Sequence, residues 1–330
     1  MAVERPAAAA ARSSRGNGFF MSALRFAGYD LDGRPATPTS QITDPTSAGA
    51  VSAGGRYMHT LPADVESARS LLEEYSNVSP EDVDRHVYQM RDRLWDVYPY
   101  ACVGRFRFIS MEFALDAYYQ VALFRLLQAQ SEPEPTPEDD ETRLLDVGCC
   151  VGQVLRKLAF DGVDSARLYG TDIEPRFVDI GFDLFRDRDK FRGQFVIGDM
   201  LKPGESDDER LDVLDGKMTF IHATSFFHLF TWDDQVRAAT RMVRFLQPER
   251  RDVMIFGRQV GTMLPRDNGK AGSDKVYLHN ADSWQRLWDE VGERTGTKWK
   301  TTMEPTETID TGAGGVESSL RKMSFSVSRG

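Results

Sequence analysis

The sequence has few cysteines, and its basic residues form no dense cluster. Cys149 and Cys150 are chain neighbours and poor disulfide partners, and Cys102 completes no spacing typical of a metal site. A reducing, intracellular and cytoplasmic setting is therefore expected. The 330 residues carry 41 Lys and Arg against 51 Asp and Glu, a net charge of −10. Nucleic acid is therefore not an expected partner.

A long, uninterrupted hydrophobic run is also missing. The most apolar segment, Phe108–Leu127, contains Glu112, Asp116, Gln120 and Arg125. This pattern predicts an amphipathic helix packed on a domain and no membrane span. The N-terminus has no apolar core ahead of a cleavage site, so no secretion signal is expected.

Composition divides the chain into four parts. Residues 1–56 are rich in Ala, Ser, Gly, Thr and Pro and are predicted to be mostly disordered. Within them, the apolar patch Gly18–Phe26 either docks on the surface or closes over a site. Residues 57–130 are a helical, substrate-side segment, 131–141 an acidic linker, and 142–330 the main domain.

Three helices are predicted before the first strand, at Asp64–Tyr75, Glu81–Val97 and about Arg107–Gln128. The segment Tyr98–Arg105 between the last two is rich in aromatic residues and is predicted to be a non-helical connector. Helices ahead of a sheet suggest an N-terminal helical cap over the edge where the sheet binds its ligand.

From Arg143 onward, short apolar runs alternate with helical patterns. Strands are predicted at Arg143–Val147, Arg167–Thr171, Gln194–Gly198, Lys217–His222, Asp252–Gly257, Lys298–Met303 and Arg321–Ser328. Helices are predicted at about Gly152–Phe160, Pro175–Asp187, Trp232–Leu246 and Ala281–Glu293. The alternation indicates an α/β fold with a doubly wound, Rossmann-like, seven-stranded sheet whose last two strands make an antiparallel edge.

The stretch Arg143–Gln153 carries the first binding motif. An apolar strand reaches Asp146, and the chain then turns through Gly148, Cys149 and Gly152 into a helix. Glycine permits a sharp turn and a close approach of the backbone to a ligand. Open α/β sheets bind their ligands at such carboxyl ends of strands.

Two further acids stand at the ends of the next strands. Asp172 ends the second strand, where a carboxylate can accept hydrogen bonds from ribose hydroxyls, and Ile173 can lie against a flat base. Asp199 ends the third strand beside Met200, where a carboxylate can accept from an adenine amine. Either acid alone is as well explained as a helix N-cap. Three acids at consecutive strand ends, beside a glycine turn, favour a nucleotide site.

The turn lacks the G-x-G-x-x-G pattern of dinucleotide sites and the Gly-Lys-Ser/Thr of a P-loop, so a compact nucleoside ligand is favoured. The motifs Asp146–Gly152, Tyr169–Ile173 and Gly198–Met200 resemble the first three motifs of the class I S-adenosylmethionine-dependent methyltransferases. The resemblance implies S-adenosylmethionine as the cofactor. Cys150 stands where the family usually has a middle glycine, which would set the turn slightly farther from the ligand.

A narrower resemblance is to fungal methyltransferases of polyketide and meroterpenoid pathways. It is carried by Tyr98–Gly104, Gly181–Arg188, Ile221–Phe230, Gly257–Gly261 and His279–Trp284. It implies O-methylation of a small-molecule acceptor in a secondary-metabolite pathway. As the expected methyl acceptor, a carboxylate, which would give a methyl ester, ranks above an enolic or phenolic hydroxyl.

The histidines near the fourth strand are the candidates for proton transfer. An ionised carboxylate acceptor needs no base, whereas a phenol or enol can need one. His228 is equally well a catalytic base or a residue that fixes its loop. His222, at the end of the strand, is expected to be a wall of the donor pocket.

Five residues are predicted on the acceptor side. Arg258 follows the fifth strand and either holds a substrate carboxylate or pairs with one of the chain's acids. Phe226 either lines the acceptor pocket or packs in the core. His279 is a weaker candidate, and Tyr100 and Arg105 in the connector have helix capping as their alternative.

No metal is expected. The pair Asp233-Asp234 suggests the metal site of catechol-type methyltransferases, but those enzymes also need an acid at the end of the fourth strand. This chain has His222-Ala223 there, so the pair is better explained as a helix N-cap.

Other functional classes can use the same sheet. A short-chain dehydrogenase should show a three-glycine turn and a Tyr-x-x-x-Lys pair, and neither is present. A non-catalytic interaction protein would be expected to lose Asp172, Gly148 or Gly152, which are intact. A C- or N-methyltransferase acting on a small acceptor remains an alternative. The aromatic connector argues against a protein or RNA methyltransferase, because it favours a small apolar acceptor.

Overall fold

The structure is a computed structural model that describes residues 51–52, 57–131, 142–202, 209–264, 276–309 and 319–330. All of them belong to the compact unit Thr43–Gly330, and the second unit, Met1–Ile42, lies outside the described residues. The predicted apolar patch Gly18–Phe26 and residues 132–141 of the predicted acidic linker also lie outside them. The division into four parts therefore stays a prediction.

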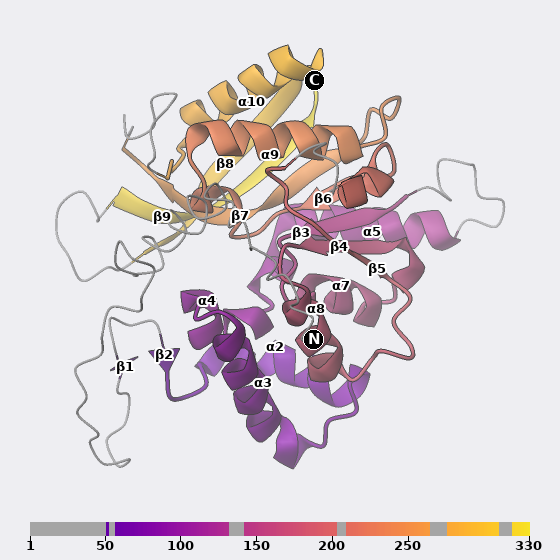
Figure 1. Ribbon diagram of the computed structural model, residues 1–330, viewed down its shortest axis with the longest axis vertical. Helices are drawn as coiled ribbons and strands as arrows, with labels where there is room; N and C mark the ends of the chain where they lie inside the picture. Colours follow the sequence, from indigo (N-terminus) through magenta and orange to yellow (C-terminus); the bar gives the residue numbers. More distant parts are fainter. Residues whose placement is uncertain (1–50, 53–56, 132–141, 203–208, 265–275, 310–318) are drawn as a thin grey trace, which may run out of the picture. The chain divides into compact units, whose positions relative to one another are not determined.

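Seven strands form one sheet in the order β5-β4-β3-β6-β7-β9-β8 (Figure 1). Their bounds are Leu144–Val147 (β3), Leu168–Asp172 (β4), Gln194–Ile197 (β5), Phe220–His222 (β6), Met254–Thr262 (β7), Trp299–Thr308 (β8) and Leu320–Arg329 (β9). The strands from β5 to β7 pair in parallel, and β9 runs antiparallel to both β7 and β8. The predicted sheet and its antiparallel edge are confirmed. A separate two-stranded pair joins β1 (Val51–Ser52) to β2 (Tyr57–Met58).

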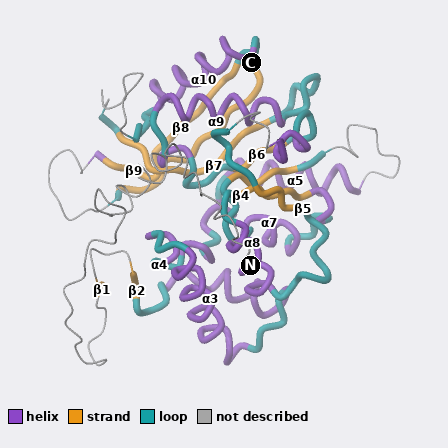
Figure 2. Tube along the Cα trace, in the orientation of Figure 1, coloured by secondary structure: helices purple, strands orange, loops and turns teal. Residues whose placement is uncertain are grey.

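Helices cover both faces of the sheet (Figures 1 and 2). On one face lie α9 (Trp232–Phe245) and α10 (Ala281–Thr295), and on the other lie α7 (Gln153–Phe160) and α8 (Pro175–Phe185). All four follow the predicted ranges closely. Short 3-10 helices are η6 (Ser165–Arg167), η7 (Glu209–Leu214) and η8 (Phe227–Leu229). No helix in the described ranges is both long and apolar enough to cross a membrane.

The first two predicted helices are present with irregular starts or ends. They comprise η1 (Ala63–Val65), α2 (Glu66–Ser70) and the π-helical turn η2 (Leu71–Tyr75), followed by η3 (Pro80–Asp82) and α3 (Val83–Val97). The connector, predicted to be non-helical, contains the short helix α4 (Ala101–Gly104), so that prediction was wrong in part.

The third predicted helix is also wrong at its start. It breaks into η4 (Arg107–Ile109), η5 (Glu112–Leu115) and α5 (Ala117–Ser131). Phe106 has a left-handed backbone, with φ of 57°, and Asp116 is extended and accepts the N–H of Tyr118 at 2.9 Å. This local cap lets the α-helix begin only at Ala117, whatever the apolar pattern before it.

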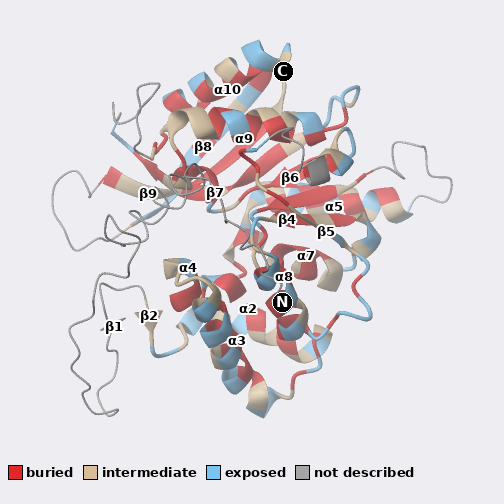
Figure 3. Ribbon diagram, viewed as in Figure 1, coloured by how far each residue is buried: buried red, intermediate tan, exposed pale blue. Residues whose placement is uncertain are grey.

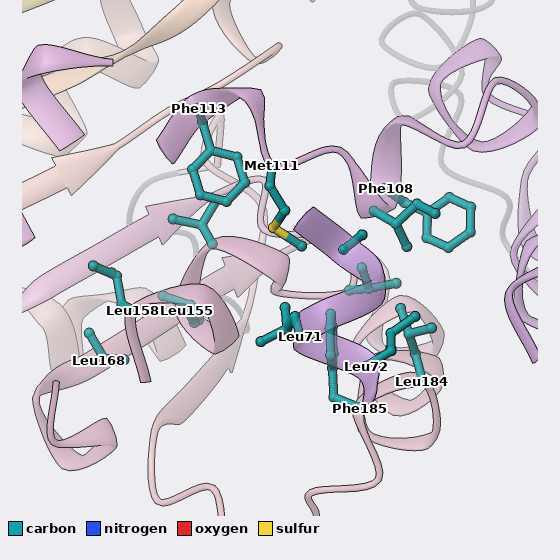
Figure 4. Packing of buried hydrophobic residues seen from close by; sticks show 14 of the residues in the cluster. Leu71, Leu72, Phe108, Met111, Phe113, Leu155, Leu158, Leu168, Leu184 and Phe185 are labelled. Atoms are coloured by element: carbon teal, nitrogen blue, oxygen red, sulfur yellow. The ribbon is translucent and has the colours of Figure 1, made fainter. Parts of the chain in front are cut away.

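The N-terminal helices pack on α7 and α8 in one apolar cluster (Figure 4). Leu71 and Leu72 of η2 share it with Leu155 of α7 and with Leu184 and Phe185 of α8. Figure 3 shows the buried sides of these helices turned inward and the exposed sides turned outward. The helical region therefore covers two helices of the main domain.

A buried ion pair fixes this packing. Arg156 of α7 and Asp187, which follows α8, have fully buried side chains, with Nε–Oδ2 and Nη2–Oδ1 distances of 2.9 and 3.2 Å. Tyr75 of η2 donates its hydroxyl to Asp187 at 2.8 Å. Four phenylalanine rings surround the guanidinium, with centroids 4.4–5.4 Å from Cζ: Phe182, Phe185, Phe191 and Phe195. The ion pair thus joins the N-terminal helices to the sheet domain.

The variant Asp187→Ala should lower the free energy of unfolding by about 3–5 kcal/mol, because Arg156 would keep a buried charge without a partner. Urea denaturation measures this loss. The control is Asp179→Ala on α8, which breaks the exposed pair with Arg188 (side chains 65% and 59% exposed) and should change the stability little. Equal losses in the two variants would contradict the role of the buried pair.

Candidate active site

The chain turns sharply between β3 and α7. Gly148 and Gly152 have φ of 70° and 66°, and the N–H groups of Gly148 and Cys149 donate to the carbonyl of Thr171 at 2.8 and 3.0 Å. A Cβ on Gly148 would lie 3.1 Å from the ring of Phe226. The turn therefore requires glycine at position 148. Phe226, which follows β6, packs against this turn.

Arg156 supports the same turn from within the domain. Its Nη1 donates to the carbonyl of Val151 at 3.3 Å, and a Cβ on Gly152 would lie 2.4 Å from this Nη1. Cys150, at the position where a glycine is usual, adopts a left-handed φ of 49°. Such a conformation costs a non-glycine residue about 1–2 kcal/mol. The turn keeps the glycine-like geometry despite the cysteine.

Asp172 receives two backbone hydrogen bonds at the end of β4. Cys150 N–H donates to Oδ2 at 2.8 Å and Glu174 N–H to Oδ1 at 3.0 Å. Burial raises the pKa of Asp172, and these backbone donors oppose the shift. Each oxygen can accept a second hydrogen bond, so the carboxylate is able to receive a pair of ribose hydroxyls.

The neighbouring residues suit a flat base. Ile173 is 45% exposed, which leaves its side chain open for contact. Asp199 Oδ1 accepts the N–H of Leu201 at 2.9 Å, and Oδ2 lies 4.0 Å from Lys202 Nζ. Met200 is buried beside them. The exposed apolar side chain, the acid beside it and the tight glycine turn together fit S-adenosylmethionine.

A hydrogen-bonded chain that is buried at Asp146 and His222 and half-buried at Thr224 links β3 to β6 and β7. His222 Nδ1 lies 2.7 Å from Asp146 Oδ1, and its Nε2 lies 2.8 Å from Thr224 Oγ1. Thr224 Oγ1 also accepts the N–H of Arg258 at 3.1 Å. The consistent proton arrangement has the Thr224 hydroxyl donating to Nε2, and Nδ1–H donating to Asp146. Both nitrogens of His222 are therefore engaged, and the Asp146 carboxylate is directed to the histidine.

His228 lies in η8 and is buried. Burial lowers the pKa of His228 to about 4. The ring is therefore neutral at pH 7, and it is a weaker proton acceptor than an ordinary histidine.

Arg258 lies on β7 beside two acids. Its Nη1 is 3.8 Å from Glu112 Oε2 and its Nε is 3.9 Å from Asp116 Oδ2, both longer than a hydrogen bond. The buried Nε has no hydrogen-bond partner among the residues that the structure describes. The guanidinium is thus partly balanced in charge but keeps donors for a further anion.

The structure places two predicted acceptor-side residues, His279 and Arg105, in different surroundings. His279 is 1% exposed, with Nδ1 3.0 Å from Ser283 Oγ and Nε2 2.9 Å from Gln235 Oε1. Burial lowers the pKa of His279 to about 3, and its hydrogen bonds fix the start of α10. Arg105 is exposed at the end of α4. Their roles as substrate contacts stay predictions.

Tyr100 reaches the cofactor side of the edge. Its ring centroid is 6.1 Å from that of Phe177 on α8. Burial raises the pKa of Tyr100, and the charges of Tyr98 and Asp172 add to the shift. The connector therefore approaches the predicted ribose acceptor, although Tyr100 was predicted to contact the methyl acceptor.

The pair Asp233-Asp234 stands in the first turn of α9. Asp234 N–H donates to Thr231 Oγ1 at 3.3 Å, and its Oδ1 lies 3.2 Å from Arg237. These contacts belong to a capped helix start. Among the described residues, no three His, Cys, Asp or Glu side chains gather as a metal site would need. The expected absence of a metal requirement stays a prediction.

Sequence reasoning missed several residues that shape the site. Thr224 accepts from Arg258 and Arg156 pairs with Asp187, and both partners are distant in sequence, so no local pattern indicates these contacts. Phe113 of η5 lies with its ring 6.1 Å from His222. Gln259 could have been noticed in the sequence, because it is a polar residue shortly after the apolar run Val253–Phe256.

Two family models match the chain. The family described as meroterpenoid methyltransferase N-terminal domain matches residues 57–109, and the family described as methyltransferase domain matches residues 144–249.

Fungal proteins are similar over most of the chain. The O-methyltransferase phiE of a fungal species is 38% identical over 240 residues, covering 72% of this chain and 75% of that protein. The O-methyltransferase atr3 of Stereocaulon alpinum is 36% identical, covering 75% and 68%. The asnovolin E/chermesin D methyltransferase nvfJ of Aspergillus novofumigatus is 34% identical, covering 71% and 78%.

Asp172→Ala should weaken binding of S-adenosylmethionine by roughly 1–3 kcal/mol, because it removes the charged acceptor at the end of β4. Isothermal titration calorimetry measures the change. Glu174→Gln is the control, since the Glu174 side chain bonds to Arg176 and caps α8. Unchanged affinity in a folded Asp172→Ala protein would refute the assignment.

The buried histidines should make the fold sensitive to acid. The pKa of His279 is about 3 in the folded chain and about 6.5 when unfolded, so the unfolded state binds more protons between these values. This stabilising contribution is complete above pH 6.5 and falls as the pH drops through that window. The melting temperature should fall from pH 7 to pH 5, and less so in His279→Asn. An identical fall in both proteins would be inconsistent with this reasoning.

Proposed function

Because the chain belongs to the fungal secondary-metabolite methyltransferases, which use S-adenosylmethionine, we propose that it methylates a carboxylate oxygen of a small natural-product intermediate. Two of its relatives are named O-methyltransferases, which supports oxygen as the acceptor atom. Bound S-adenosylmethionine supplies an activated methyl group on a sulfonium. The residues of this chain then have to hold the acceptor in line and keep its oxygen ionised.

The observation that carries the carboxylate proposal is the state of His228. With a pKa of about 4, this side chain cannot readily take the proton of a phenol, whose pKa is about 10. His222 offers no alternative, because Asp146 and Thr224 occupy its two nitrogens. An acceptor that is already ionised at neutral pH needs neither histidine as a base.

Arg258 supplies a complementary group. Its buried Nε lacks a hydrogen-bond partner among the described residues, and its ion pairs with Glu112 and Asp116 are long. A substrate carboxylate can use the remaining donors of the guanidinium. In this proposal Arg258 binds the anion, and Phe226 and His228 form the neighbouring wall.

The alternative acceptor is an enolic or phenolic hydroxyl. The two acceptors predict different pH profiles. For a carboxylate the rate should be flat from about pH 6 to 8.5, since the acceptor is ionised throughout. For an enol or phenol the rate should rise with pH through the pKa of the acceptor, because a histidine with a pKa of about 4 has no titration left in that range.

Two variants sharpen this test. His228→Gln should lose less than about tenfold in kcat with a carboxylate, but on the order of 10²-fold if His228 is a base. Arg258→Met should mainly raise KM for the acceptor, because the contact is shared by ground and transition states. Arg107→Met is the control for Arg258, since Arg107 also pairs with Glu112 but from a 45% exposed side chain. A product methylated on carbon or nitrogen, identified by NMR, would overturn the proposal.

A further inference from the structure

Strand β7 extends past its neighbour at the acceptor side of the sheet. The last residue of β6, His222, pairs with Phe256, whereas β7 continues to Thr262. Over this extension β7 pairs with β9 on one side only. On its other side Ser225 N–H donates to Arg258 O at 2.7 Å, so the segment that follows β6 runs along the start of the extension.

Gln259 lies in this extension with an unsatisfied side chain. It is 3% exposed, and neither Nε2 nor Oε1 has a hydrogen-bond partner among the residues that the structure describes. In the pairing of β7 with β9, Gln259 lies opposite Met323. The turn η8, which carries His228, packs against β7. A primary amide buried without partners destabilises a fold, so such a group is expected to have a use outside folding.

A second buried glutamine shows that the fold can satisfy such an amide. Gln235 of α9 is 0% exposed, and its Nε2 donates to the carbonyls of Phe230 and Tyr277 at 3.1 and 2.9 Å. Its Oε1 lies 2.9 Å from His279 Nε2. Both glutamines are buried primary amides, but among the described residues only Gln235 has hydrogen-bond partners.

We propose that the side-chain amide of Gln259 binds the methyl acceptor, donating from Nε2 and accepting at Oε1. The proposal rests on the proposed function and narrows its substrate class. Arg258 and Gln259 are consecutive on a strand and leave β7 on opposite faces, so they contact different parts of the acceptor. The acceptor therefore carries a second polar group, a hydroxyl or a carbonyl, away from the oxygen that is methylated.

The first test compares the two glutamines by thermal unfolding. Gln259→Met should raise the melting temperature by about 2 °C or more, because it removes an unpaired buried amide at nearly constant volume. Gln235→Met should lower the melting temperature, because three buried polar groups would each lose a hydrogen bond. A lower melting temperature in Gln259→Met would overturn the proposal, since it would show that the amide serves the fold.

The second test uses steady-state kinetics with the full chain. The probe is the fastest acceptor from a panel of aromatic and polycyclic acids with and without ring hydroxyl or oxo groups. Gln259→Met should raise KM for a hydroxylated or oxo acceptor about tenfold or more and leave the affinity for S-adenosylmethionine unchanged. The matched acceptor without that group should show the same KM in the variant and the wild type.

An unchanged KM for the hydroxylated acceptor would overturn the role of Gln259 while leaving methyl transfer to a carboxylate intact. The site of methylation, read from the product by NMR, tests the proposed function separately. A carbon- or nitrogen-methylated product with a raised KM in Gln259→Met would keep the Gln259 contact and remove the carboxylate.

Discussion

The ion pair between Arg156 and Asp187 is the constraint on which the arrangement of this protein depends. A fully buried charged pair is tolerated only when its geometry is good and its remaining donors are satisfied. Here Asp187 also receives the hydroxyl of Tyr75, and Arg156 also donates to Val151 in the glycine turn. The same guanidinium therefore holds the N-terminal helices and the turn that approaches the cofactor.

The chemistry of the site follows from how little freedom its residues have. Asp146, His222 and Thr224 form a chain whose hydrogen bonds fix each member, and Phe226 packs on Gly148. Methyl transfer from a sulfonium requires alignment more than proton transfer. A rigid edge with engaged or poorly basic histidines suits that requirement, and it leaves the acceptor to bring its own negative charge.

The sheet could be predicted because its signals are local. Apolar runs and turn residues predict the strands, the glycine turn after β3, and the acids at or near the strand ends, which are Asp146, Asp172 and Asp199. The broken start of the third helix could not be predicted in the same way. The apolar pattern extends on both sides of Ser110 and Asp116 and so predicts one continuous helix. The helix is interrupted by the left-handed backbone of Phe106 and by the cap at Asp116.

Side-chain roles were harder to predict than strands for the same reason. Asp146 and His222 were assigned to the cofactor separately, but they are 76 residues apart in sequence and satisfy each other. Tyr100 was assigned to the acceptor, yet the packing of α4 brings it towards Asp172. Such pairings depend on the register of β3, β4 and β6, which a single sequence does not specify.

Burial has opposite consequences for the polar residues around the methyl-transfer edge. His279 and Gln235 lie in the same hydrogen-bonded group, so their burial contributes a fixed loop and a capped α10. Gln259 is buried almost as deeply, but its side chain has no hydrogen-bond partner among the residues that the structure describes. Since replacing such an amide by an apolar side chain tends to be neutral or stabilising, its presence is not explained by folding. In the proposal above, a bound acceptor supplies the partners, and its hydrogen bonds would offset the cost of burying the amide only while it is bound. The unsatisfied amide thus favours an acceptor that has a matching polar group over one that lacks it.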